Sequence, residues 1–330
     1  MFKNRKLTIA LIIGLMLLAG LLLVLKSRSQ PAVIPLERLP QPKIESPSRE
    51  ASLKIESRLQ SDKISIPNKL PVYTLSTTPV SLEESVQIAT NLGFTGSPQV
   101  LNDARFGTVY IWSEAANGNL RIVPTTHIID YKTPLATPKT GTTFQPEEET
   151  VAKAKRFLIS RSLTTEDKLS LPKVRYIAIT DESYAEVNQD LADLVDIIFI
   201  ETINGYQLVN PTTEIGTINV KIDRNNNIVS VYVDKADQIV SAADYKVKTF
   251  SELVLSLGAA KIQSLDNGNI DPSSLPASSI NKIVVNNANI AYFQELSIKQ
   301  QYLQPVFVLE GTALLDGGQT VPVLLYLSAL

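Results

Sequence analysis

The chain has 330 residues, of which 44% are hydrophobic and 19% are charged, so that one to three folded domains are expected rather than a disordered protein. It contains no cysteine and a single histidine, which excludes disulfides, thiol catalysis, thiolate metal sites and multi-histidine metal sites. Residues 1–70 hold 12 Lys/Arg against 5 Asp/Glu, a balance of +7; subtraction from the totals of 31 and 33 leaves 19 against 28, or −9, for residues 71–330. Such an acidic body argues against nucleic acid as a ligand.

An apolar run near the start predicts a membrane anchor. Leu7–Leu25 contains nineteen residues without a charge, and as a helix it would span about 28 Å, close to the thickness of a bilayer core. Three basic residues precede it against two that follow closely, so the positive-inside rule places the N-terminus in the cytoplasm. The alternative is a cleaved signal peptide, although its apolar core is usually shorter. The prediction is a single-pass protein of the cell membrane with an extracytoplasmic C-terminal domain.

Five segments are predicted along the chain. Behind the cytoplasmic tip and anchor comes a proline-rich stem, which is typical of an extended, semi-flexible segment. Three units follow, each with one helix on antiparallel strands. The boundaries are 1–25 for the tip and anchor, 26–69 for the stem, 70–142 for the first small unit, 143–240 for the second and 241–330 for the third. The predicted fold class is thus α+β, with repeated helix-on-sheet units behind a single transmembrane helix.

The helices of the first two units have recognisable starts. Ser81 and Glu84 have the spacing of a capping box, and Pro146 precedes three glutamates where the helix dipole favours them. Turns are predicted at Asn117-Gly118 and Asn204-Gly205, because these residues tolerate positive φ angles. The predicted strands are 70–75, 107–114 and 120–132 in the first unit, and 173–179, 193–202, 216–223 and 227–234 in the second.

The third unit is predicted to contain a helix at 245–260, a strand at 280–295 and a terminal hairpin at 306–330. The hairpin turn falls at Asp316–Gln319, where Gly317-Gly318 suits a two-residue loop.

This hairpin carries one carboxylate, Glu310, in an apolar setting. A two-residue loop pairs it with Leu325, and apolar neighbours on both faces predict that it is buried. A buried carboxylate needs an ionic partner or a raised pKa. Glu310 is therefore predicted to form an ion pair, with Lys246, Lys248 and Lys282 as the candidate partners.

No motif indicates catalytic, cofactor or metal chemistry. His127 lacks the partners of a catalytic triad and is predicted to be a strand residue. Asp223, Asn225 and Asn227 imitate half of a calcium loop, but the later glycine and glutamate are missing, so that a hairpin tip is predicted. The chain is therefore predicted not to be an enzyme and to need no cofactor. The rival functions are a hydrolase with an acidic cleft at Glu310, a protease-inhibitory module and a cell-envelope binding module.

Several stretches resemble one family. "YKVKTFSELVLSLG", "INKIVVNNANIAYF" and "QYLQPVFVLEGTALLDG" are similar to the C-terminal region of the YycH/YycI family of two-component-system regulatory proteins. "INGYQLVNPTTEIGTINVKIDRNNNIVSVYV" (203–233) also resembles the hairpin of that family and of PepSY-type domains. The similarity covers residues 145–330. It implies a PepSY-like α+β ectodomain on a single-pass membrane protein, which restrains a membrane sensor histidine kinase through protein contacts.

The expected partners follow from this resemblance and from the anchor. They are a membrane protein such as a sensor kinase, or a related regulator. A homodimer and a heterodimer both stay open, nucleic acid is excluded, and the membrane is contacted through residues 7–25.

Overall fold

The structure, a computed structural model, describes most of the chain beyond residue 53. The described residues are 39–40, 42, 44, 54–76, 78–136, 142–170, 172–179, 184–210, 216–234, 238–266, 270, 275, 279–295 and 300–330. Of these residues, 49% lie in strands and 16% in helices. The predicted α+β class is therefore wrong: the chain is mainly β, because its strands join into two large sheets while its helices are few and short. Residues 40–330 form one compact unit.

The predicted membrane anchor, Leu7–Leu25, lies outside the described residues. Within the described ranges, no helix is both long enough and apolar enough to cross a membrane. The longest of them, α3 (Glu147–Ser160), has 14 residues and starts with three glutamates, whereas a spanning helix needs roughly 20 apolar residues. The predictions of a transmembrane helix, a signal anchor and a membrane localisation thus find no support in the structure and are withdrawn.

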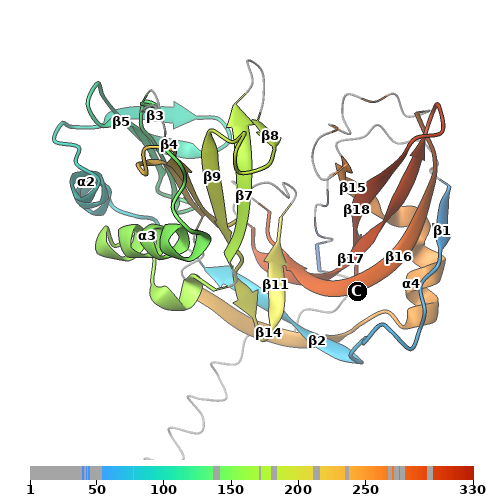
Figure 1. The fold of residues 1–330 in the computed structure, drawn as a ribbon. Coiled ribbons are helices and arrows are strands. Elements are labelled where there is room, and N and C mark those ends of the chain that lie inside the picture. Colours follow the sequence, from blue (N-terminus) through green and yellow to red (C-terminus); the bar gives the residue numbers. More distant parts are fainter. Residues whose placement is uncertain are drawn as a thin grey trace, which may run out of the picture. The chain divides into compact units, whose positions relative to one another are not determined.

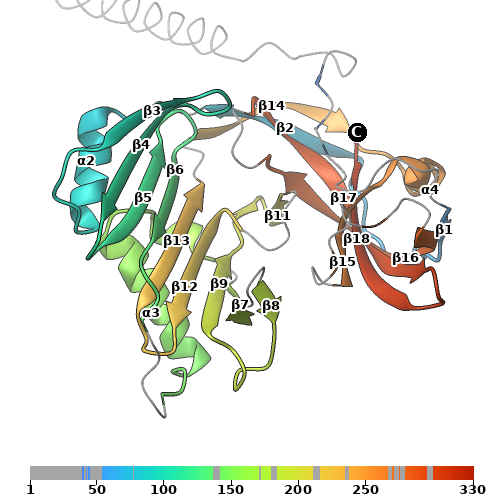
Figure 2. The same ribbon diagram turned by 90° about the horizontal axis from the view of Figure 1, so that it is seen from above.

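An N-terminal sheet contains nine antiparallel strands in the order β3-β4-β5-β6-β13-β12-β9-β7-β8. One of its faces is covered by α2 (Leu82–Asn91) and α3, which is followed by the short 3₁₀ helix η2 (Glu166–Lys168) (Figures 1 and 2). The strands are β3 (Gln99–Asp103), β4 (Gly107–Glu114), β5 (Gly118–Val123), β6 (Ile128–Lys132), β7 (Pro172–Ile179), β8 (Tyr184–Glu186), β9 (Leu194–Phe199), β12 (Ile218–Asp223) and β13 (Ile228–Asp234).

This sheet consists of two similar halves. In the first, α2 precedes the meander β3-β4-β5-β6; in the second, α3 precedes β7, β9, β12 and β13, with further strands inserted. The halves meet at their last strands, where Ile128 of β6 lies opposite Asp234 of β13. Both helices contribute to a single core, in which Phe94, Trp112 and Leu158 are buried. Each helix thus covers its own half of one continuous sheet.

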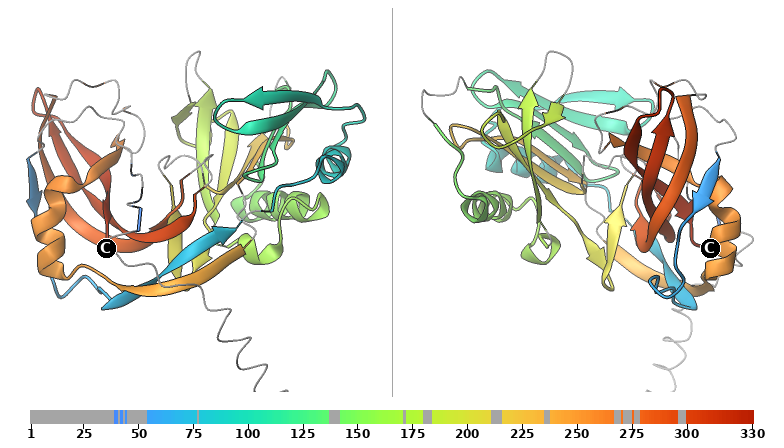
Figure 3. Two further views of the ribbon diagram at one scale, coloured as in Figure 1. Left: turned by 180° about the vertical axis from the view of Figure 1, so that it is seen from behind. Right: turned by 45° about the vertical axis from the view of Figure 1, so that its right-hand side comes forward.

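A C-terminal sheet contains the other nine described strands. Its main path is β10-β11-β16-β17-β18-β15; β1 and β11 both pair in parallel with β16, while β2 pairs with β14 and β17. Figures 1 and 3 show β2 and β14 running side by side. The strands are β1 (Ile55–Ser57), β2 (Lys69–Ser76), β10 (Thr202–Ile203), β11 (Tyr206–Val209), β14 (Gln238–Lys246), β15 (Lys261–Leu265), β16 (Ile280–Phe293), β17 (Tyr302–Leu315) and β18 (Thr320–Ser328).

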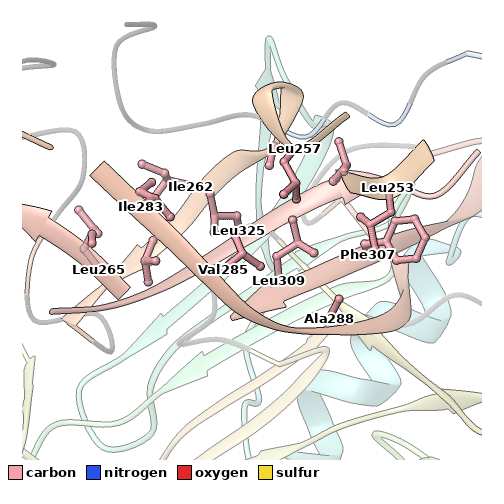
Figure 4. Close-up of a cluster of buried hydrophobic side chains, with 14 of the residues drawn as sticks. Leu253, Leu257, Ile262, Leu265, Ile283, Val285, Ala288, Phe307, Leu309 and Leu325 are labelled. Atoms are coloured by element: carbon pink, nitrogen blue, oxygen red, sulfur yellow. The ribbon is translucent and has the colours of Figure 1, made fainter. Parts of the chain in front are cut away.

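The core of the C-terminal sheet lies beneath one short helix. The helix α4 (Phe250–Ser256) continues into a 3₁₀ turn, η3 (Leu257–Ala259). Leu253 and Leu257 are buried against the strands, with Leu253 beside Phe307 (Figure 4).

This helix starts later than the predicted span of 245–260. Tyr245 and Lys246 are strand residues of β14, opposite Leu70 and Lys69 of β2. The side chain of Thr249 then forms a capping box with Glu252, which starts the helix at Phe250.

The terminal hairpin has a different register from the predicted one. Gly317 and Gly318 have φ angles of 89° and 84°, as a turn of this kind requires. The loop has three residues, however, because the N–H of Leu315 donates to the carbonyl of Gln319 at 2.8 Å. Glu310 therefore lies opposite Leu324 and not Leu325. Since successive strand residues alternate between faces, this shift by one residue exchanges the two faces of β18.

Candidate functional site

Glu310 is exposed, contrary to the prediction that it is buried. Its carboxylate accepts a hydrogen bond from Nδ2 of Asn287 at 3.1 Å, across the pair β16–β17. Lys246 lies 3.6 Å from Glu252 at the surface. The structure therefore does not bring Glu310 and Lys246 together.

The other two candidate lysines also use their charge elsewhere. Nζ of Lys248 donates to the backbone oxygens of Ser328, at 2.9 Å, and of Leu330. Burial lowers the pKa of Lys248, and the nearby carboxylate of Glu252 partly opposes this shift. Lys282 lies 2.6 Å from Glu56. Sequence reasoning failed here because the pairing partner of Glu310 depends on the strand register.

His127 and Asp223 both belong to turns. His127 has a φ of 56° between β5 and β6, so that it is not the predicted strand residue, and its Nε2 hydrogen-bonds the carbonyl of Thr78. Asp223 accepts hydrogen bonds from the backbone N–H of Asn227 at 2.7 Å and from its side chain at 3.1 Å, which confirms the predicted hairpin tip. Across the residues that the structure describes, no group of three or more His, Cys, Asp or Glu side chains is placed to bind a metal ion.

The strongest candidate site is the face of the N-terminal sheet that α2 and α3 leave uncovered, here called the open face. Successive strand residues point to opposite sides, so residues that alternate with the helix-side core point to the open face. Strand register arranges them in two cross-strand rows. The first is Arg121, Asp130, Tyr232, Asn219, Ile198 and Lys173; the second is Asn119, Lys132, Ser230, Lys221, Asp196 and Arg175.

A buried charge cluster lies in the middle of the open face. Asp196 is fully buried; its Oδ2 lies 2.6 Å from Nη2 of Arg175, and its Oδ1 accepts a hydrogen bond from Nδ2 of Asn219 at 2.6 Å. Removing a carboxylate from water is costly unless it is paired and hydrogen-bonded. Both oxygens of Asp196 are used in this way, so the cluster holds three neighbouring strands in a defined polar arrangement.

A second charge cluster lies on the first half of the same face. The carboxylate of Asp130 has Nζ of Lys132 at 3.4 Å and Nη2 of Arg121 at 3.7 Å. The guanidinium of Arg121 also lies over the ring of Phe106, 5.5 Å from its centroid. The side chain of Lys132 is 64% exposed, so this positive charge is accessible to a ligand.

These two rows of the open face are positive although the body of the chain is acidic. Outside the rows, the same alternation places four further carboxylates on the open face, those of Asp103, Glu186, Asp223 and Asp234. The two rows contain five cationic side chains against two carboxylates, a balance of +3, whereas residues 71–330 together carry −9. The positive groups are Arg121, Lys132, Lys173, Arg175 and Lys221, and the negative groups are Asp130 and Asp196. The sequence does not reveal this face, because neighbouring residues of the rows are up to about a hundred positions apart in the chain. The one local signal is the alternation of polar and apolar residues within each strand, which indicates a polar face.

Comparison with known proteins provides no assignment. No protein-family model matches the chain, and no curated protein matches it.

Proposed function

We propose that the chain is a regulatory protein that works by contact with another protein, and that its open face binds an acidic segment of that partner. The observation that supports this proposal is the balance of +3 on the two cross-strand rows within an acidic body. Like charges would keep an acidic partner away from most of the surface, whereas the two positive rows of the open face would attract it. Charge thus favours one orientation of the complex.

The face has both fixed and accessible parts. Arg175 and Asn219 are held by Asp196, which gives the sheet a polar floor of defined geometry. Lys132 and Lys173 are exposed and project beyond this floor. Side chains of this kind are suited to long-range attraction and to contact at the rim of an interface.

The resemblance to the YycH/YycI family makes a sensor histidine kinase the first partner to test. A regulator of a kinase needs no catalytic group, and we propose no catalytic role for the chain.

The test replaces two lysines of the open face. In the double variant Lys173→Glu with Lys221→Glu, attraction to an acidic segment becomes repulsion, so we expect binding to the purified kinase to weaken by about tenfold. Raising the ionic strength should weaken wild-type binding in the same direction. The measurements are the dissociation constant by calorimetry and the kinase autophosphorylation rate with and without the full chain.

A matched control carries the same change in net charge elsewhere. Lys63 and Lys69 are exposed outside the N-terminal sheet, and their double change to glutamate should leave the dissociation constant unchanged. If both double variants weaken binding to the kinase equally, only the net charge of the chain matters for binding. That result would overturn the proposal that the open face is the binding surface. If the wild-type chain neither binds the kinase nor changes its rate, the kinase is the wrong partner. In that case, photo-crosslinking from position 230 in cells tests for any acidic partner, and recovery of none overturns the proposal.

A further inference from the structure

The strand β3 is an edge without the usual protection. It is the first strand in the N-terminal sheet and, among the described strands, pairs only with β4. All five of its residues, Gln99–Asp103, are exposed. Edge strands are commonly protected by lysine, proline or a bulge; the sequence of β3 is QVLND, and its register with β4 has no shift.

Apolar side chains are exposed on both faces of this edge. Val100 is 54% exposed and Leu101 is 41% exposed. Because Val100 lies opposite Tyr110, it points to the side of α2, while Leu101 points to the open face beside Val109. The helix α2, which covers this end of the sheet in Figure 2, exposes Leu82 and Val86 one helical turn apart. The edge therefore offers backbone groups for pairing and apolar surface to either side.

We propose that β3 pairs with β3 of a second copy of this chain, antiparallel and about a two-fold axis at Leu101. In this register Leu101 lies opposite Leu101 of the second copy, Val100 opposite Asn102, and Gln99 opposite Asp103. No like charges face each other, since Asp103 is the only charged residue of the strand. Its carboxylate already accepts hydrogen bonds from the N–H groups of Arg105, at 2.7 Å, and Phe106, at 2.9 Å.

The junction within the chain provides a precedent for this geometry. The two halves of the N-terminal sheet join through the antiparallel pair β6–β13, and both helices then lie on one face. A two-fold axis perpendicular to the sheet at β3 would repeat this arrangement between two chains. Rotation about such an axis leaves each face of the sheet on the same side, so the helix-covered faces of both copies would point in the same direction. The nine-stranded sheets would become one continuous sheet, and α2 would lie near its copy, which would help to cover Leu82 and Val86.

A single introduced cysteine tests this pairing in the full chain. The protein has no cysteine of its own, so Leu101→Cys cannot form a disulfide within its own chain, and a disulfide between two copies is recognised by its doubled mass. Directly opposed residues in an antiparallel pair have Cα atoms about 4.5–5.5 Å apart, within the range that a disulfide spans. We expect mild oxidation in cells to convert most of this variant into a linked species of 72.4 kDa, twice the chain mass of 36.2 kDa.

Two further cysteine variants serve as controls. Leu255 on α4 is 86% exposed, so Leu255→Cys reports random collisions between chains and should give little linked species. Residue 102 also lies on the proposed dimer edge, but in this register it is two residues out of step with residue 102 of the second copy. Their Cα atoms would be about 8 Å apart, which is too far for Asn102→Cys to form a disulfide with its copy. Equal linking by Leu101→Cys and Leu255→Cys, or stronger linking by Asn102→Cys, would overturn the pairing about Leu101.

The oligomeric state without cross-linking provides a second measurement. Leu101→Lys places two lysines opposite each other at the axis, so the dimer dissociation constant should rise by at least about tenfold. Leu255→Lys should leave this constant unchanged. Sedimentation of the wild-type full chain as a monomer at micromolar concentration would overturn the proposal, as would a Leu101→Lys variant that dimerises as strongly as the wild type.

Discussion

At the scale of single residues, two glycines with almost equal backbone angles have different surroundings. Gly118 has a φ of 82° and Gly205 a φ of 83°, and both lie in turns that the sequence predicts. A Cβ on Gly118 would lie 2.1 Å from the carbonyl oxygen of Lys132, whereas a Cβ on Gly205 would have no heavy atom within 4 Å. The positive φ explains both glycines; the approach of β6 constrains only Gly118.

Alanine at the two positions separates these effects. Gly205→Ala should lower the free energy of unfolding by about 1 kcal/mol, the cost of a positive φ for a residue with a Cβ. Gly118→Ala should lower it by roughly 2–4 kcal/mol, because the β5–β6 pair must also move apart. Urea unfolding followed by circular dichroism measures both values. Equal losses would mean that the backbone at Gly118 relaxes freely.

At the scale of elements, one carboxylate connects the end of α2 to the β4–β5 hairpin. Glu114 accepts hydrogen bonds from the N–H of Thr95 at 2.8 Å, Nδ2 of Asn117 at 2.8 Å and the N–H of Gly96 at 3.1 Å. Nε1 of Trp112 donates to the carbonyl of Gly96 at 2.9 Å. The hydrogen bonds from Thr95, Asn117 and Gly96 favour the charged carboxylate and lower the pKa of Glu114 below its usual value.

This lowered pKa predicts how stability changes with pH. A carboxyl group whose pKa is lower in the folded state stabilises the fold fully above its unfolded pKa, about 4.3, and loses this effect as the pH falls through its folded pKa. Glu114→Gln removes the linkage, so the stability difference between wild type and variant should be constant above about pH 5 and shrink below about pH 4. Urea titrations from neutral to acidic pH measure it. A difference that stays constant down to pH 3 would contradict the proposed role of Glu114.

At the scale of the whole molecule, the two sheets do not follow the order of the predicted units. The strand β2, from the first predicted unit, pairs with β14 and β17, and β11, from the second, pairs with β16. Leu70 belongs to the same core as Leu253 of α4. By contrast, every strand of the N-terminal sheet lies between residues 99 and 234.

Chain fragments should therefore differ in stability. Residues 78–234 contain the whole N-terminal sheet with α2 and α3, and we expect this fragment to unfold cooperatively. Residues 241–330 lack β1, β2, β11 and the first three residues of β14. We expect them to lose cooperative unfolding, because β16 loses its pairing with β1 and β11, and β17 loses its pairing with β2. Fusing residues 54–76 through a flexible linker to residues 238–330 should restore a transition. Thermal and urea unfolding measure this; a cooperative transition in 241–330 alone would contradict it.

The predictions that succeeded were those that depend on neighbouring residues. The capping box of Ser81 and Glu84 and the hairpin tip at Asp223 form as predicted, since each involves residues only a few positions apart. Most strands also occur near their predicted places, because alternating or continuous apolar runs mark them locally. The helix predicted at 245–260 was wrong in its first turn, where pairing with β2 overrides the local pattern.

By itself the sequence determined the start of α2 and the turns at Asn117-Gly118 and Asn204-Gly205, because the chemistry of a few adjacent side chains decides these. Tertiary structure alone decided which strands become neighbours, since that choice depends on hydrogen bonds and packing between residues far apart in the chain. Glu310 is exposed because a three-residue loop sets the register of β17 against β18. Two rows of the open face are positive because six strands align the five cationic side chains from Arg121 to Lys221 across the sheet. The edge at β3 is available because no other described strand pairs beyond it.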